Sequence, residues 1–360
     1  MASPDRQYTV AILGATGLVG SHLISILEER NFPVKTLVPL ASGKSAGQSV
    51  RFKNENVTVV EATPDAFDGV DIVLASAGAS VSKLLIPEAV KRGAVVVDNT
   101  SFFRMHPDVP LVVAGVNNDD LKKHRGIVAN PNCSTMQLMP VLKTLNQLSP
   151  MKRVIVSTYQ SVSGAGKKGI DELLESTAEF LRRTEDPQAP MSDPKVFQRP
   201  IAFNLIPHID VFMDGDEEGY TKEETKIIHE TRKILHRPDL LISATAVRVP
   251  VMVGHSEAVT IDFEIPVSPK QATEALAKNP DIIVRSENTD YPTPVEATGK
   301  DPVYVGRIRR DLSNPKTGLC LWVVADNLRI GAALNTVRLA EELAKMDLVR
   351  VPEGKTVAAV

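Results

Sequence analysis

The chain has 360 residues, of which 43% are hydrophobic and 24% are charged. This length is enough for two domains of about 150 residues each, and the composition excludes fibrous and disordered proteins. Because 41 basic residues stand against 44 acidic ones, for a net charge of −3, we expect no nucleic-acid partner. The longest apolar runs, such as 319–325, are far shorter than the roughly 18 residues that span a bilayer. We therefore expect that this protein does not span a membrane.

The start of the chain carries no targeting signal that we can identify. Segment 1–6 has no apolar stretch and no arginine-rich arm, so we expect neither a signal nor a transit peptide, and hence a cytoplasmic protein. The two cysteines, Cys133 and Cys320, are too few for a disulfide scaffold. No His-x-x-x-His or Cys-x-x-Cys spacing occurs, so we expect no metal.

The first hundred residues alternate short β-branched runs with helical stretches. This rhythm is typical of βαβ units and predicts a doubly wound, mainly parallel sheet of the Rossmann type. The predicted strands are 8–13, 34–38, 57–60, 71–75 and 94–98, and the predicted helices are 18–30 and 81–92.

After a helix predicted over 133–148, the pattern changes to longer strands in which apolar and polar residues alternate. This change predicts a second α+β domain with a more antiparallel sheet. Its strands are 153–160, 240–249, 258–265 and 318–325, its helices are 169–183 and 221–235, and 184–200 is a surface loop. A last helix is predicted over 331–346.

A glycine turn follows the first strand and opens the first helix. It has the spacing G-x-x-G-x-x-G and consists of Gly14, Ala15, Thr16, Gly17, Leu18, Val19 and Gly20. In this context the backbone N–H groups can approach a dinucleotide pyrophosphate, although tight strand-to-helix packing alone can also select such glycines.

The region after the second predicted strand favours NADP over NAD. An acid that would bind the ribose 2′-hydroxyl is expected about 20 residues after the glycine turn, yet none lies between Glu29 and Glu55. Ser42, Lys44 and Ser45 lie there instead, and a cation among hydroxyls suits a 2′-phosphate. The alternative is that Lys44 is simply a solvated loop lysine.

Cys133 follows a proline turn and begins the helix over 133–148, with Ser134 and Gln137 at capping-box spacing. The positive end of a helix dipole lowers a thiol pKa, which favours a nucleophilic thiolate. The alternative is a small buried hydrophobe, an interpretation that Cys320 fits well. A thiolate beside a nicotinamide can add to an aldehyde, pass a hydride to the cofactor and leave a thioester.

The joint order and spacing of six segments resembles the aspartate-semialdehyde dehydrogenase family over nearly the whole chain. The segments are 14–20, 42–47, 130–135, 201–207, 248–256 and 326–333. The resemblance implies that Cys133 is the acyl-forming nucleophile, that His255 is the general acid/base and that Gln160 orients the substrate. It also implies cofactor contacts from Ser76, Ala77, Gly78, Asn99, Ser101, Ser163, Gly164 and Asn327, besides the glycine turn and the loop of Ser42, Lys44 and Ser45.

The substrate residues combine a pattern with an implied role. Arg248 shares a strand face with two alanines, which leaves room for a guanidinium fork, and the resemblance implies that it binds the substrate α-carboxylate. Glu223 and Lys226 are i,i+3 neighbours on one helix, where a solvated ion pair is the plain interpretation, while Glu224 makes a capping box with Thr221. The resemblance implies instead that Glu223 binds the substrate amino group. It also implies that Lys226 and Arg104 hold phosphate, and it places Asn132 at the substrate.

The resulting prediction is an NADP-dependent enzyme that interconverts L-aspartate 4-semialdehyde and 4-phospho-L-aspartate with inorganic phosphate, for amino-acid biosynthesis. Residues 1–132 and 331–360 would bind NADP, and 133–330 would form a catalytic and dimerisation domain. We expect a homodimer, with pairing of dimers into a homotetramer left open. The alternatives are N-acetyl-glutamyl-phosphate reductase and a non-catalytic NADPH-binding sensor.

Overall fold

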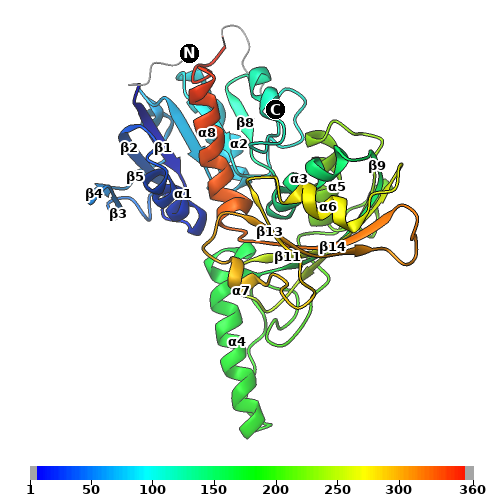
Figure 1. The fold of residues 1–360 in the computed structure, drawn as a ribbon. Helices are drawn as coiled ribbons and strands as arrows, with labels where there is room; N and C mark the ends of the chain where they lie inside the picture. Colours follow the sequence, from blue (N-terminus) through cyan, green and yellow to red (C-terminus); the bar gives the residue numbers. More distant parts are fainter. Residues whose placement is uncertain (1–5, 353–360) are drawn as a thin grey trace. The chain divides into compact units, whose positions relative to one another are not determined.

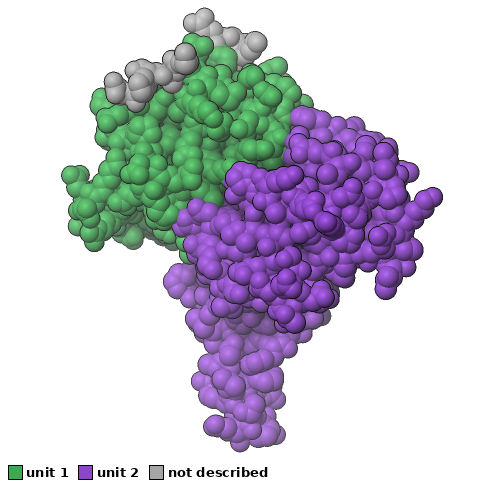
Figure 2. Space-filling model, viewed as in Figure 1, with its two compact units in different colours: residues 1–132, 332–360 green, residues 133–331 purple. Residues whose placement is uncertain are grey.

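The structure is a computed structural model that describes residues 6–352. The chain divides into two compact units, residues 1–132 with 332–360 and residues 133–331 (Figure 2). Segment 1–5, on which the expectation about targeting largely rests, lies outside the described residues. Within the described residues, no helix is both long and apolar enough to cross a membrane.

The first unit is built on a parallel sheet of six strands in the order β5-β2-β1-β6-β7-β8. The strands are β1 (Tyr8–Leu13), β2 (Val34–Ala41), β5 (Val60–Glu61), β6 (Ile72–Ala75), β7 (Val95–Asp98) and β8 (Ile127–Ala129). The apolar runs of β1, β6, β7 and β8 are buried, as expected of a parallel sheet with helices on both faces, whereas the edge strand β5 is exposed. The predicted doubly wound fold is confirmed.

Three helices cover this sheet. They are α1 (Leu18–Glu29), α2 (Ala79–Lys91) and α8 (Leu334–Lys345). Helices α1 and α8 pack against each other and are joined by an ion pair between Arg30 and Glu341, at 2.7 Å. Helix α2 lies behind the sheet in Figure 1. The C-terminal helix therefore returns to the first unit, as the resemblance implied.

The second unit holds a mixed sheet of six strands in the order β10-β9-β11-β14-β13-β12. Its strands are β9 (Met151–Gln160), β10 (Leu241–Arg248), β11 (His255–Phe263), β12 (Ile282–Arg285), β13 (Val303–Arg310) and β14 (Gly318–Ala325). The inner pairs β9–β11, β11–β14 and β13–β14 are antiparallel, and the outer pairs β9–β10 and β12–β13 are parallel. The predicted change of sheet type is confirmed.

Helices cover one face of this second sheet. They are α3 (Cys133–Asn146), α5 (Lys222–Ile234) and α6 (Pro269–Leu276), and they gather on one side in Figure 1. Helix α4 (Lys167–Glu185) extends away on the other side, and α7 (Pro294–Ala297) is a single turn near β14. The sheet therefore has one face buried under helices and one less covered.

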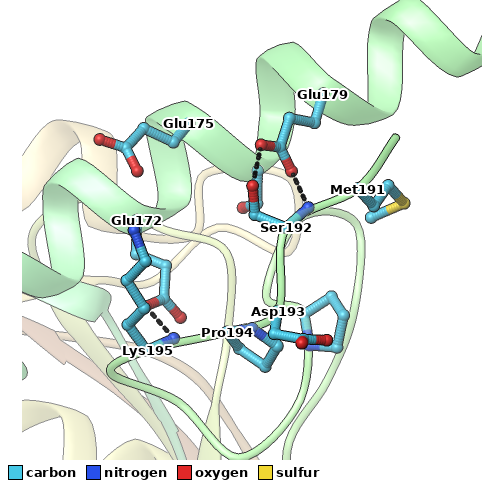
Figure 3. A pocket seen from close by; sticks show the side chains of 10 residues that line it. Glu172, Glu175, Glu179, Met191, Ser192, Asp193, Pro194 and Lys195 are labelled. Atoms are coloured by element: carbon cyan, nitrogen blue, oxygen red, sulfur yellow. Dashed lines mark hydrogen bonds between the residues drawn. The ribbon is translucent and has the colours of Figure 1, made fainter. Parts of the chain in front are cut away.

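The long loop after α4 is fastened to that helix by two glutamates (Figure 3). The Glu179 carboxylate accepts hydrogen bonds from the backbone N–H and the hydroxyl of Ser192, at 2.9 and 2.7 Å. Glu172 accepts from the backbone N–H groups of Lys195 and Val196. The predicted surface loop over 184–200 is therefore irregular in secondary structure but anchored at two points.

Several predicted boundaries were wrong. The single strand over 57–60 is instead the end of a hairpin, β3 (Ser49–Phe52) with β4 (Glu55–Thr58), followed by the separate β5. The hairpin turn is Lys53-Asn54, both with positive φ, a turn that lacks the usual glycine. The last helix begins at Leu334 rather than at residue 331, because a π-helical turn, Arg329–Ala333, precedes it.

Candidate functional site

The thiol of Cys133 and the imidazole of His255 face each other in the second unit. Cys133 is the first residue of α3 and His255 is the first residue of β11, and Cys133 Sγ lies 3.2 Å from His255 Nε2. His255 is fully buried, whereas Cys133 is half-buried. A helix N-terminus and a histidine thus meet at one sulfur, an arrangement that favours thiolate chemistry.

Two features of the surroundings keep His255 neutral. Its Nδ1 accepts a hydrogen bond from the backbone N–H of Ser161, at 3.0 Å. Burial, and then the nearby positive charge of Arg248, lower the pKa of His255 to about 3. The ring is therefore uncharged at neutral pH.

Arg248 and Gln160 are direct neighbours at the ends of β10 and β9, where their backbones pair in register. Both side chains are buried on the helix-covered face, and Arg248 shares its strand face with two buried alanines, as predicted. Arg248 Nη1 donates to the carbonyl of Ser161 at 2.7 Å, while Arg248 Nε is buried without a partner among the described residues. An orphaned guanidinium N–H is a donor available to an anionic ligand.

Glu223 connects Gln160 to Lys226. Its carboxylate accepts from Gln160 Nε2 at 3.2 Å and from Lys226 Nζ at 3.1 Å. Lys226 also donates to Asp210, at 2.8 Å. Burial alone would lower the pKa of Lys226, but the two carboxylates outweigh it and raise that pKa. The predicted ion pair and the capping box of Thr221 with Glu224 are both present.

The Asn327 side chain joins two loops beside His255. Its Oδ1 accepts from the hydroxyls of Ser161 and Ser163 and from the backbone N–H of Gly254. Its Nδ2 donates to Ser163 Oγ at 3.0 Å. Asn327 and Ser163, which were both predicted to contact the cofactor, are therefore hydrogen-bonded to each other.

Gly164 lies close to two side chains of the site, Arg248 and His255. A methyl at this position would stand 2.9 Å from Arg248 Nη1 and 3.6 Å from His255 Nε2. Gly331 is similarly close to the nucleophile, since its methyl would stand 3.1 Å from Cys133 Cβ. Both glycines make room for side chains of the site.

Four residues of this unit were not foreseen or differ from expectation. Ser161 and Asp210 were missed, since a serine in a small-residue loop and an aspartate before a helix carry no distinctive spacing. Ser134 does not cap α3 with Gln137, because the helix already begins at Cys133. Cys320 is half-buried rather than enclosed in a core.

The glycine turn of the first unit lies where the strand order reverses, between β1 and β6. A methyl on Gly14 would stand 3.0 Å from the backbone of Ala77, and one on Gly20 would stand 2.1 Å from the Gly14 carbonyl. Gly17 caps α1 without any side-chain hydrogen bond. A glycine turn that begins a helix at a topological switch point is typical of a dinucleotide site.

The other predicted cofactor residues of this unit lie on neighbouring loops. Ser42, Lys44 and Ser45 form the turn that follows β2, closed by a hydrogen bond from Ser45 N–H to the Ser42 carbonyl. Ser76, Ala77 and Gly78 connect β6 to α2. All of these loops follow carboxyl ends of parallel strands, as do Asn99 and Ser101 after β7.

Arg104 is held near Asn99 within the first unit. Arg104 Nη2 donates to the Asn99 carbonyl at 2.9 Å, and the Asn99 side chain accepts from Asn130 at 2.6 Å. Arg104 and Asn132 are both buried. Asn132 ends this unit and immediately precedes Cys133 in the chain.

These features define a class of protein, an oxidoreductase with a dinucleotide-binding unit and a thiol–histidine pair. Two family models match the chain: "Semialdehyde dehydrogenase, NAD binding domain" over residues 9–124 and "Semialdehyde dehydrogenase, dimerisation domain" over 142–330.

Named relatives narrow the class. The aspartate-semialdehyde dehydrogenase of Aquifex aeolicus is 49% identical over 95% of this chain and 99% of its own, and that of Bacillus subtilis is 49% identical over 96% and 99%. The crystal structure of aspartate semialdehyde dehydrogenase II from Vibrio cholerae matches with a TM-score of 0.90 and 45% identity, over 94% of this chain and 99% of that one. The chain belongs to the aspartate-semialdehyde dehydrogenase family.

Proposed function

We propose that this protein interconverts L-aspartate 4-semialdehyde and 4-phospho-L-aspartate through a thioester on Cys133, with NADP as the redox partner. The observation that carries the proposal is the 3.2 Å approach of Cys133 Sγ to His255 Nε2, beside buried Arg248 and Gln160, in a chain of this family. Another structure of the Vibrio cholerae relative, also 45% identical, is described as a complex with ASA, which supports the aldehyde substrate.

The substrate would be held at both ends of its amino-acid moiety. The unpartnered Nε–H of Arg248 suits an α-carboxylate, because charge-assisted hydrogen bonds to a guanidinium are strong and directional. The buried carboxylate of Glu223 suits the α-ammonium group. An acetylated amino group would carry no positive charge, so Glu223 favours the free amino acid over the N-acetylated alternative.

The chemistry in the biosynthetic direction begins with attack of the Cys133 thiolate on the acyl phosphate carbon. The bond from that carbon to the phosphate oxygen breaks, and phosphate leaves with the electron pair. Lys226 and Arg104 are the cations proposed to stabilise the phosphate. For Lys226 this requires the phosphate to compete with Glu223 and Asp210, which already hold its ammonium group.

The second half of the reaction reduces the thioester. NADPH, when bound, supplies the hydride. The thiohemiacetal that results collapses when its carbon–sulfur bond breaks, which releases the aldehyde and returns the thiolate. His255 is the group proposed to manage the proton at the carbonyl oxygen, and Gln160 is proposed to orient the acyl group.

The fit of the dinucleotide rests on the first unit. The glycine turn is too tightly packed at Gly14 and Gly20 for side chains, and α1 begins without a side-chain cap. Both features suit a pyrophosphate at the start of the helix. Selection of NADP would come from the loop of Ser42, Lys44 and Ser45. We expect Lys44→Glu to weaken NADPH binding far more than NADH binding; equal affinity for NADPH in the variant would contradict this assignment.

We also propose a homodimer formed through the second unit. The sheet face away from α3, α5 and α6 exposes apolar side chains, of which Ile155 is 36% exposed and Trp322 is partly buried. Sedimentation velocity separates monomer, dimer and tetramer, and a charge placed at Ile155 is expected to yield monomers. A cytoplasmic location is likewise part of the proposal, supported by the two cysteines, neither of which forms a disulfide.

The experiment that tests the proposal replaces the nucleophile. Cys133→Ala is expected to abolish turnover in both directions while NADPH still binds. Unchanged turnover would reject the assignment of Cys133, and loss of NADPH binding as well would show that the variant is damaged elsewhere.

A further inference from the structure

One group at the ring of His255, the backbone N–H of Ser161, has a fixed hydrogen-bonding role. A backbone N–H can only donate, so the Ser161 N–H, 3.0 Å from Nδ1, requires a lone pair at that nitrogen. A neutral imidazole with a lone pair at Nδ1 carries its single proton at Nε2. That nitrogen is the one that faces Cys133 Sγ, at 3.2 Å.

Asn327 keeps Ser161 in this position. The Ser161 hydroxyl, 3.1 Å from Nδ1, donates to Asn327 Oδ1 at 3.0 Å. The orientation of the Asn327 amide is set in turn by the backbone N–H of Gly254, which donates to the same oxygen at 2.8 Å. Two backbone donors thus fix the side-chain amide and the imidazole.

We propose that Ser161, anchored by Asn327, is a positioning residue that fixes His255 as the tautomer with its proton on Nε2, directed at the Cys133 sulfur. The proposal deepens the function proposed above, because it assigns the first task of His255. In the resting enzyme the imidazole donates a hydrogen bond to the thiolate and does not accept the thiol proton at Nε2.

The charged groups around the His255 ring favour its neutral form, in which the imidazole donates from Nε2. The groups that face His255 are the Arg248 guanidinium on β10, the Glu223 carboxylate on α5 and the Cys133 thiol on α3. Burial and Arg248 disfavour the imidazolium, and Glu223 and a backbone hydrogen bond with Gly254 offset them only in part, so the pKa falls to about 3. Unlike the histidine of a serine-protease triad, His255 has no carboxylate hydrogen-bonded to Nδ1 among the described residues.

The test is nitrogen NMR of the unliganded full chain labelled at its histidines, with His255→Asn to assign the signal. We expect one neutral Nε2–H form between about pH 5 and about pH 9, instead of titration near the ordinary value of 6.5. A proton on Nδ1, or titration near 6.5, would overturn the proposal. Because no substrate or cofactor is present, this result is independent of whether the proposed reaction is correct.

Variants test the anchoring itself. Ser161→Ala removes the hydroxyl bonded to Asn327, and we expect mixed tautomers and alkylation of Cys133 slowed by about fivefold, as for the loss of about one hydrogen bond. Ser163→Ala is the matched control, since Ser163 hydrogen-bonds the side chains of Ser161 and Asn327 but has no hydrogen bond to His255 among the described residues, and its His255 signal is expected to stay as in the wild type. Ser161→Thr, which keeps a hydroxyl, is expected to restore the signal. Equal shifts in the Ser161→Ala and Ser163→Ala variants would contradict a specific role of Ser161.

Discussion

Replacing Arg248 by lysine tests the recognition of the substrate carboxylate most sharply. Arg248 uses Nη1 to hold the Ser161 carbonyl at 2.7 Å and retains a buried, unpartnered Nε–H. Lysine keeps the charge, but one ammonium group lacks the planar fork that serves both partners at once. The variant therefore separates the positive charge from the geometry of the donor.

The expected loss follows from one charge-assisted hydrogen bond, worth about 1.5–3 kcal/mol. Because about 1.4 kcal/mol corresponds to a factor of ten, kcat/KM for aspartate semialdehyde should fall by about 10- to 150-fold. Steady-state kinetics measure this loss. A variant that keeps kcat/KM within about twofold of the wild type would refute the reasoning.

A second measurement excludes indirect damage to the nucleophile. Iodoacetate carries a carboxylate and iodoacetamide does not. The ratio of the rates at which they alkylate Cys133 therefore measures the effect of the positive charge of Arg248 near the thiol. In Arg248→Leu, alkylation by iodoacetate is expected to slow far more than alkylation by iodoacetamide. Equal slowing of both would show that Arg248 acts only by holding Ser161.

The remaining predictions concern Glu223, Gly164 and two buried titratable groups. Glu223→Gln is expected to raise KM for the amino-acid substrate, measured by initial rates, and an unchanged KM would contradict ammonium binding. Gly164→Ala, whose methyl would stand 2.9 Å from the Arg248 guanidinium, is expected to lower kcat/KM without lowering the melting temperature. Burial raises the pKa of Glu257, so the carboxyl takes up a proton on folding above about pH 4.5, and Glu257→Gln should stabilise the protein at pH 8 but not at pH 4. The pKa of His255 is depressed instead, so this residue costs stability as pH falls from about 6.5 toward about 3, by up to about 1.4 kcal/mol per pH unit. His255→Asn should therefore flatten the acid side of the stability curve, and an unchanged slope in urea titrations would argue against a neutral His255.

Much of the fold followed from the sequence because the relevant signals are local. Apolar runs that alternate with helical stretches located β1, β2, β6 and β7 of the first unit but not β8, and the capping box of Thr221 with Glu224 marked the start of α5. The hairpin at Lys53-Asn54 was missed because its turn lacks glycine. Helix α6 was also missed, although Ser268 and Gln271 form a capping box at its start.

The sequence predicted residues of the site but not the contacts that join them. Face periodicity placed Arg248 on a strand face with two alanines, yet its pairing in register with Gln160 depends on β9 and β10 being parallel neighbours. The link from Lys226 to Asp210 and the contact of Ser161 with His255 join residues 16 and 94 positions apart. Such contacts are set by tertiary packing, which one sequence does not reveal.

NADP⁺ reduction with L-aspartate 4-semialdehyde, with and without inorganic phosphate, in the wild type and in Cys133→Ala, decides whether the reaction proceeds through a thioester. We expect reduction that requires both phosphate and Cys133. Sustained reduction in the Cys133→Ala protein, or turnover at the same rate without phosphate, would contradict a thioester on Cys133 as the intermediate of this reaction.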